Sequence, residues 1–191
     1  MSLGEELDAH YRAHVGPDPI RWGNRETWPP PVSLHEWNAS SNRMGVHFYA
    51  TYGMSLAALR GSVSHGVELY SGVDQKSDEL RDAMAALASN ARDSGTIFRD
   101  CEILDAQAAV IPGRTFTGWI FFDRSDQVLP DLALSNGCHI KYLDIAPVFP
   151  EEVEYSRANG VDALLELWNS EGTEVWVHTR PVPHALVSEH P

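Results

Sequence analysis

The densest group of carboxylates in the sequence follows Pro150, where Glu151, Glu152 and Glu154 lie close together. Paired carboxylates at short spacing can act as general acid and general base. Pro150 suits the first turn of a helix, however, and so places Glu151 and Glu152 beside exposed backbone N–H groups at the positive end of the helix dipole. This position favours the ionised carboxylate, whereas a general acid must hold its proton near neutral pH. The cluster therefore indicates a helix start, and we expect Glu152 to fold back onto the backbone N–H of Phe149, as half of a capping box.

Nine histidines invite a test for a metal site. His10 and His14 are four residues apart and share a helix face, but zinc needs further ligands and the segment lacks the glutamate of a metalloprotease helix. We interpret the two as an exposed or packed pair. Four other histidines lie in segments that read as strands: His47, His65, His139 and His178. Each of the four is interpreted as a sheet-face residue with one satisfied hydrogen bond, so no metal-ligating or cofactor-binding residue is assigned.

The two cysteines do not suggest a catalytic thiol. Cys138 precedes His139, but adjacent strand residues point to opposite faces, so the two should not form a dyad. Cys101 has no identifiable base, and both cysteines are interpreted as small, partly buried residues. There is no CxxC pattern and no signal-peptide core, and the longest apolar runs, such as 119–122, are too short to cross a bilayer. The expected setting is the cytoplasm, without contact to a membrane.

Motifs and charge exclude several function classes. The sequence contains neither GxGxxG, nor GxxxxGK[ST], nor GxSxG, so no nucleotide fingerprint, phosphate loop or nucleophile elbow is predicted. Acidic residues number 27 against 14 basic ones, for a net charge of -13. Such a surface repels phosphate backbones, so nucleic acid is not expected as a ligand. The charge is compatible with a basic protein partner, but from charge alone simple solubility is the favoured explanation.

Two helical regions can be placed with their boundaries. The segment 78–94 has Ser77 as N-cap, Gly95 as terminator and an apolar stripe at helical spacing. The stripe consists of Leu80, Met84, Leu87 and Ala91, widened by Ala83 and Ala88. The carboxylate cluster begins a second region, which Asn159-Gly160 divides into two short helices or one broken helix. In its second half Val161, Leu164, Leu165 and Trp168 are expected to be buried. A further short helix is expected before Gly16.

Six segments favour strands: 46–52, 65–70, 96–104, 117–123, 138–149 and 173–180. The first alternates apolar and polar residues and reads as a half-buried strand, close to or paired with the second. The proline-rich segment 16–37 reads as an ordered loop that folds over its own domain and covers Trp28 and Trp37. Trp119, Trp168 and Trp176 are expected in the core. The prediction is one α+β domain over residues 1–191, a mixed β-sheet with two or three helices packed on it.

Four segments in order resemble the Suppressor of fused family. KYLDIAPVFPEEVEYSRANGVDALLELW is similar to its signature region, a strand followed by a helix with paired glutamates, a glycine break and a leucine-rich helix. GPDPIRWG resembles the early GPDP segment of the family. HFYATYGMS and HGVELY are similar to the two strands that follow it. The resemblance covers about residues 10–180 and implies an α+β fold like the N-terminal domain of the family, without an established catalytic site.

The resemblance implies that this protein is a non-enzymatic protein-binding module. Eukaryotic members restrain a transcription factor by holding a peptide between this domain and a C-terminal domain, and the 191 residues are expected to contain only the first of the two. Bacterial single-domain members are proposed as immunity proteins, which would make the partner a basic toxin domain. The alternative is a hydrolase or metal-dependent enzyme whose residues converge only in three dimensions, and a third hypothesis is a structural homo-oligomer. The sequence assigns no catalytic and no partner-binding residue.

Overall fold

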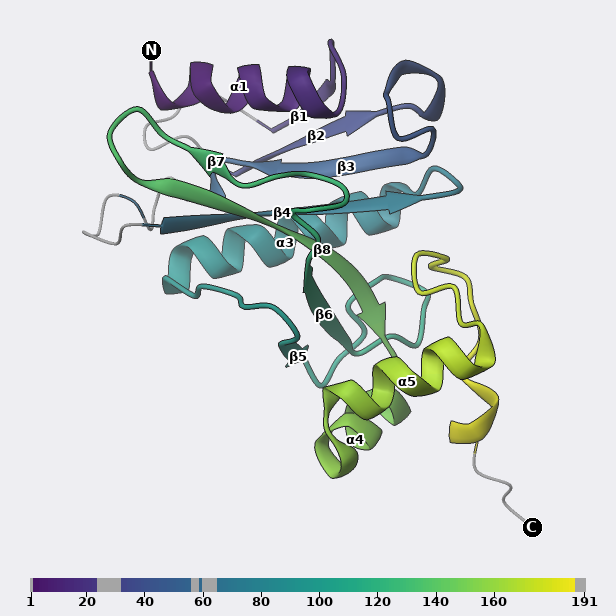
Figure 1. Cartoon of the computed structure of the whole chain (residues 1–191). Helices are drawn as coiled ribbons and strands as arrows, with labels where there is room; N and C mark the ends of the chain where they lie inside the picture. The colour runs from purple at the N-terminus through teal and green to yellow at the C-terminus, as the bar shows by residue number, and fades with distance from the viewer. Residues whose placement is uncertain (1, 24–31, 56–58, 60–64, 188–191) are drawn as a thin grey trace.

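The computed structural model describes residues 2–23, 32–55, 59 and 65–187. Figure 1 shows its elements along the chain. The helices are α1 (Leu3–His14), α3 (Asp78–Ser94), α4 (Pro150–Asn159) and α5 (Val161–Glu171), with short 3-10 turns at Ala39–Ser41 and His184–Leu186. The strands are β1 (Ile20–Trp22), β2 (Ser33–Trp37), β3 (His47–Tyr52), β4 (His65–Val73), β5 (Ile103–Asp105), β6 (Gly118–Asp123), β7 (Leu132–Ala133) and β8 (His139–Val148).

The strands form one mixed sheet in the order β1-β2-β3-β4-β8-β6-β5, with β7 paired to β8 beside this path. All pairs are antiparallel except β4 and β8, which run parallel with His65 opposite His139 and Tyr70 opposite Asp144. The predicted α+β architecture, a mixed sheet with helices packed on it, is confirmed. The predicted pairing of the strands at 46–52 and 65–70 is also confirmed, by β3 and β4.

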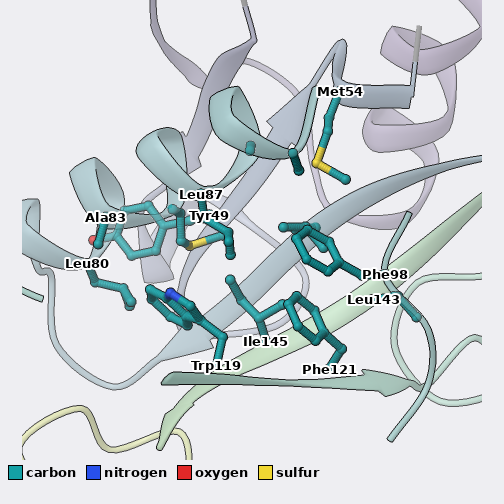
Figure 2. Close-up of a cluster of buried hydrophobic side chains, with 14 of the residues drawn as sticks. Tyr49, Met54, Leu80, Ala83, Leu87, Phe98, Trp119, Phe121, Leu143 and Ile145 are labelled. Atoms are coloured by element: carbon teal, nitrogen blue, oxygen red, sulfur yellow. The ribbon is translucent and has the colours of Figure 1, made fainter. Parts of the chain in front are cut away.

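Helices cover both faces of the sheet (Figure 1). Helix α3 packs on one face over a large apolar cluster that includes Tyr49, Leu69, Leu143 and Phe121. Part of this cluster is drawn in Figure 2. On the other face, α1 covers the region of Phe48, Tyr70 and Tyr142, and α4 with α5 covers the region of Ile120 and Ala146. Because alternate strand residues point to opposite faces, β2, β3, β4, β6 and β8 supply core residues on both faces of the sheet.

Helix α3 has the predicted boundaries. The Ser77 hydroxyl accepts a hydrogen bond from the backbone N–H of Leu80 at 3.1 Å, and Gly95 ends the helix with φ 71°, where a side chain would be strained. Leu80, Met84, Leu87 and Ala91 are buried as expected. The division at Gly160 is confirmed as well, since α4 ends at Asn159 and α5 begins at Val161. In α5, Leu164 and Trp168 are buried, while Val161 and Leu165 are partly buried beside them.

Several local expectations were wrong. The expected strand at 96–104 is a strand only at its end, where β5 begins at Ile103. Strand β3 is buried on both faces, because α1 and α3 cover it from opposite sides. The expected loop 16–37 contains β1 and β2, and β2 is entirely buried, with Trp37 in the core rather than under a loop. Trp28 and the three prolines that follow it lie outside the described residues.

The C-terminal strand expectation also failed. Residues 173–180 form consecutive turns, with hydrogen bonds from Val177 N to Glu174 O and from Arg180 N to Val177 O. The segment is therefore fixed by its own turns and by the side chain of Arg180, not by a neighbouring strand. Trp176, expected in the core, is 47% exposed. No helix among the described residues is long and apolar enough to cross a membrane.

Candidate functional site: an apolar groove between α3 and β5

A groove of about 720 Å³ runs between helix α3 and the segment that contains β5. One wall is α3, through Ala83, Ala86, Leu87 and neighbouring residues up to Ser94. The other wall is formed by Leu104 and the residues that follow it, up to Val110. Phe98 and Trp119, both buried, form the floor, and Figure 2 shows them with Ala83 and Leu87. Small alanine side chains on both walls keep the groove open.

The second wall depends on a close approach at Gly118. A Cβ atom at this position would lie 2.6 Å from the carbonyl oxygen of Leu104 and 3.0 Å from Val148 Cγ2. Only glycine therefore allows β5 to lie directly beside β6, with Leu104 opposite Trp119. Beyond β5, the chain is held to the start of β6 by hydrogen bonds from Ala106 N to Thr117 O and from Val110 N to Phe116 O. Backbone hydrogen bonds to β6 and to the residues just before it therefore hold this second wall from β5 to Val110.

Among the described residues that line the groove, Asp93 is the charged one, and its carboxylate binds the guanidinium of Arg92 at 2.7 Å. Asp105, the last residue of β5, follows Leu104 and points to the opposite face of the strand, where its carboxylate accepts a hydrogen bond from Gln107 N and forms an ion pair with Arg157 of α4 at 2.6 Å. Both interactions hold the pKa of Asp105 below its usual value, and the hydrogen bond from the Gln107 N–H makes the larger contribution. The polar lining residues Asn90, Asp93, Ser94 and Thr96 are all exposed, which places them at the rim. The groove therefore combines an apolar floor with a polar rim, as protein recognition sites do.

The groove borders the end of the sheet. Within the described residues, β5 is the terminal strand of the sheet and pairs only with β6. The free side of a terminal strand can pair with a strand of another chain, while pockets beside it receive alternate side chains. The volume falls in the range of sites that hold ligands or peptide side chains. The arrangement suits the binding of an extended apolar segment.

Glu152 has a structural role that goes beyond the expected helix start. Its carboxylate accepts the backbone N–H of Phe149 at 2.8 Å, as predicted, and the indole N–H of Trp168 at 2.7 Å. It also forms a two-point ion pair with Arg180, in which both N–O distances are 2.8 Å. Glu152 is completely buried and Arg180 nearly so, and the guanidinium also lies 4.8 Å from the ring centre of Phe149. The carboxylate joins the start of α4, α5 and the C-terminal turns, and is committed to packing.

The histidines are only partly brought together. His10 and His14 pack with ring centres 4.5 Å apart, and His10 also stacks on Tyr142, so the expectation of an exposed or packed pair is confirmed as a packed one. His65 and His139 face each other across the parallel pair, with ring centres 5.6 Å apart. His47 lies at the start of β3, whereas His178 lies in a turn instead of a strand. In the described ranges, no three His, Cys, Asp or Glu side chains are grouped so that they could hold a metal ion.

Both cysteines are partly buried, as expected. Cys138 lies just before β8 rather than inside a strand, in a turn where Leu134 N donates to Cys138 O. Burial is the main reason that the pKa of the Cys101 thiol is raised, and nearby Asp100 adds to it. A raised pKa leaves less thiolate at neutral pH, so Cys101 is poorly suited to act as a nucleophile.

Two buried acids and the groove itself escaped the sequence reasoning. Glu36 and Glu68 are completely buried, although strand alternation placed Glu68 on the face opposite Val67 and Leu69. Its carboxylate binds the turn after β3 through Gly53 N, Ser55 N and the hydroxyls of Ser55 and Thr51. Burial raises the pKa of Glu68, and these hydrogen bonds oppose the rise. In the sequence, the burial of Glu68 was indicated only by its two apolar neighbours in the strand, Val67 and Leu69.

Comparisons with known proteins agree with this fold. The family model of the Suppressor of fused protein (SUFU) matches residues 29–181. A chain of the Sufu–Fu complex crystal structure has a TM-score of 0.66 at 12% identity, covering 93% of this chain and 88% of that one. A SUFU homolog from Neisseria gonorrhoeae FA 1090 has a TM-score of 0.64 at 12% identity, with 97% and 95% covered.

A third structure, Drosophila Suppressor of Fused, has a TM-score of 0.64 at 12% identity. The match covers 97% of this chain but only 51% of the Drosophila chain. This chain therefore spans about half the length of the Drosophila protein. A comparison with curated protein sequences found no match. At these identities the solved structures establish the fold, and the family model extends over well more than half of the sequence. The signature region, the mixed sheet and the family match together show that this chain belongs to the Suppressor of fused protein family.

Proposed function

We propose that this protein is a non-enzymatic binding module that takes an extended apolar segment of a partner protein into the groove between α3 and β5. The groove carries the proposal, because it joins an apolar floor of Phe98 and Trp119 to the terminal strand of the sheet. Family membership supports it, since a Sufu chain has been crystallised in complex with Fu. In the proposed mode, the partner pairs with the backbone of β5 and places side chains between the alanines of the two walls.

The partner that we propose is a basic toxin domain, which the protein neutralises in the cytoplasm as an immunity protein. The net charge of -13 supports this choice, because long-range attraction raises the rate of encounter with a cationic protein. The exposed carboxylate of Asp93 at the rim of the groove would favour lysine or arginine at one flank of the bound segment. The apolar floor would bind the centre of that segment.

The test begins with the reading frames next to the gene. A neighbouring toxin-like protein would be produced in an inactive form and its affinity for this chain measured by calorimetry. Ala86→Arg places a long charged side chain in the groove from an exposed position of α3, and we expect it to weaken binding by about tenfold or more. Ala13→Arg makes the same change at an exposed position of α1 and serves as the matched control.

Equal binding by the two variants would remove the groove from the proposal. The competing enzyme hypothesis is checked by metal analysis of the purified protein and by a broad hydrolase screen. Stoichiometric metal bound by side chains, or turnover that a single substitution abolishes, would contradict a non-enzymatic role.

A further inference from the structure

A second cavity lies on the face of the sheet that α4 and α5 cover, opposite the face that carries the groove. Its volume is about 410 Å³, within the range of sites that hold small ligands. It lies between α5, the turns that follow α5, and the end of β6. Three aromatic side chains line it, those of Phe122, Trp168 and Trp176, together with Leu165 and Val175. The cavity is therefore suited to an apolar or aromatic group.

The walls of this cavity are held in place by the core beneath them. Phe122 and Trp168 are buried in the apolar cluster that α5 covers. The indole N–H of Trp168 donates to Glu152 at 2.7 Å, and its backbone oxygen accepts the N–H of Thr173 at 2.8 Å. Trp176 lines the same cavity but is 47% exposed, so much of its ring is available to a ligand. Because the walls are already ordered, a bound ligand would cost the protein little conformational entropy.

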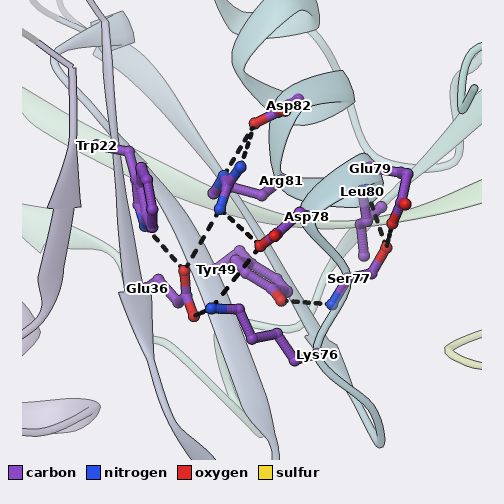
Figure 3. Close-up of polar contacts among 10 residues, drawn as sticks. All are labelled: Trp22, Glu36, Tyr49, Lys76, Ser77, Asp78, Glu79, Leu80, Arg81 and Asp82. Atoms are coloured by element: carbon purple, nitrogen blue, oxygen red, sulfur yellow. Dashed lines mark hydrogen bonds and ion pairs between the residues drawn. The ribbon is translucent and has the colours of Figure 1, made fainter.

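Arg124 is the one charged residue among the described residues that line the cavity. Within the described part of the chain its ion-pair partner is Asp144, which contacts only Nε, at 3.4 Å. No described group accepts a hydrogen bond from its Nη1 or Nη2 atoms. Arg81 is the contrasting case, because Asp78 and Asp82 bind all three of its side-chain nitrogens at 2.7 to 2.9 Å (Figure 3). The terminal nitrogens of Arg124 are therefore available to an anion in the cavity.

Asp144 neutralises Arg124 only in part. Burial raises the pKa of Asp144 from 3.8 to about 7, so near neutral pH a large fraction of these carboxyl groups carries a proton. The guanidinium stays charged throughout this range. An arginine with two free terminal nitrogens can bind a carboxylate through two parallel hydrogen bonds. The cavity thus joins an aromatic lining to a group that favours a carboxylate.

We propose that the cavity between α5 and the end of β6 binds a small carboxylic acid with an aromatic body. The ring lies against Trp168 and Trp176, and the carboxylate accepts hydrogen bonds from Nη1 and Nη2 of Arg124. The net charge of -13 favours a small monoanion over an acidic protein, because repulsion grows with the charge of the partner. The site is separate from the groove, which lies on the α3 face, and the inference does not rest on the proposed function.

The probe for this site is hydrocinnamate, a phenyl ring joined to a carboxylate by a short chain, and its matched control is the neutral amide hydrocinnamide. Each would be titrated into the full chain while the indole N–H signals are followed by NMR. We expect the acid to bind with a Kd on the order of 1 mM, as suits a ligand of this size, and the amide to bind about tenfold more weakly. The signals of Trp168 and Trp176 should shift. The signal of Trp22, which is exposed on β1 at the far end of the sheet, should not.

Three substitutions test the roles of the residues. Arg124→Gln should weaken binding of the acid by about tenfold and leave binding of the amide unchanged, because only the acid uses the guanidinium. Trp176→Ala should weaken binding of both compounds several-fold. Asp144→Asn removes the carboxylate that competes for Arg124 and should strengthen binding of the acid several-fold. This last variant also keeps the test decisive if Arg124→Gln disturbs the fold, which circular dichroism would reveal.

Ala86→Arg, which blocks the groove on the other face, is the control and should change binding of the acid by less than about twofold. Equal affinity for the acid and the amide would overturn the inference, and so would binding of the acid that survives Arg124→Gln. The absence of saturable binding up to about 10 mM acid would overturn it as well. A response to Ala86→Arg but not to Trp176→Ala would place the acid in the groove, which overturns this site and leaves the proposed function standing.

Discussion

Arg180 closes a two-point ion pair on Glu152 inside the protein, with both N–O distances at 2.8 Å. The two residues come from segments separated by α5, and neither side chain is more than slightly exposed. Removing charges from water is costly, and here the cost is offset by the pairing, by the N–H groups of Phe149 and Trp168, and by the contact of the guanidinium with aromatic rings. The pair ties the C-terminal turns to the start of α4.

We expect Glu152→Gln to lower the free energy of unfolding by about 3 kcal/mol or more, because the substitution leaves the buried charge of Arg180 without its partner. Urea denaturation followed by tryptophan fluorescence would measure the change. Arg157→Ala removes an ion pair with Asp105 in which the arginine is 59% exposed, and it should cost less, about 1 kcal/mol. Equal effects of the two substitutions would show that burial of the Glu152 pair does not matter.

Glu68→Ala should cost about 3 kcal/mol or more, because four donors in the buried turn after β3 would lose their acceptor. Glu68→Gln should cost less, since its amide oxygen can keep the three donors from Gly53 and Ser55. Thermal unfolding of both variants provides the measurement. A glutamine variant as unstable as the alanine variant would mean that the negative charge, rather than the hydrogen bonds, stabilises the turn.

Gly118→Ala should separate β5 from β6, because the new Cβ would lie 2.6 Å from a backbone oxygen. We expect a loss of stability of about 1–3 kcal/mol, the usual range for overpacking. Hydrogen exchange should increase at residues 103–106, and affinity at the groove should fall with it. Unchanged exchange at β5 would contradict the close approach as the feature that positions this wall.

Burial, with a smaller contribution from His14, lowers the pKa of His10 from 6.5 to about 4. Between these values the unfolded chain binds more protons than the folded one. The contribution of His10 to stability is therefore complete above pH 6.5 and is lost as the pH falls toward 4, with a slope of at most about 1.4 kcal/mol per pH unit. His10→Phe keeps a ring against Tyr142 and should make the acid side of the stability profile shallower. Identical slopes in chemical denaturation series would refute the assignment.

The carboxylate of Asp144 should change the stability with pH in the opposite direction to His10. Burial raises its pKa from 3.8 to about 7, against the attraction of Arg124, whose Nε lies 3.4 Å from the carboxylate. The folded state binds more protons between these values, so stability from this group is present below pH 3.8 and is lost as the pH rises to 7. Asp144→Asn should stabilise the protein at pH 8 by about 1 kcal/mol, since the side chain keeps some contact with solvent. A destabilised variant at pH 8 would show that the pair with Arg124 outweighs burial.

The elements that follow local rules were predicted well. Helix α3 matches its expected bounds, because Ser77, the apolar stripe and Gly95 act within the helix itself. The break at Gly160 is equally local. Strand β2 was missed because its core position depends on cover by α1 and α3, which a segment with prolines and polar residues does not reveal. The turns at 173–180 were taken for a strand because their apolar content could not show that Arg180 anchors them.

The groove could not be predicted, for a related reason. Ala88 packs on the sheet and Ala86 faces the groove, yet the two are the same residue type on the same helix. Their difference arises from the distance between α3 and the segment after β5, which Gly118 sets from a third element. Trp22 likewise gave no indication of its exposure, because its support comes from Glu36 and Arg81, far away in the sequence.

The parallel pair β4–β8 lies in the middle of the strand order and begins with His65 beside His139. During synthesis, β4 therefore waits for its partner until most of the chain has left the ribosome. Contacts between such distant parts of a sequence slow folding, because a long loop must close before they form. Until then β4 offers an apolar edge to other chains, which makes the nascent protein a client for chaperones and makes fragments that stop before β8 prone to aggregate.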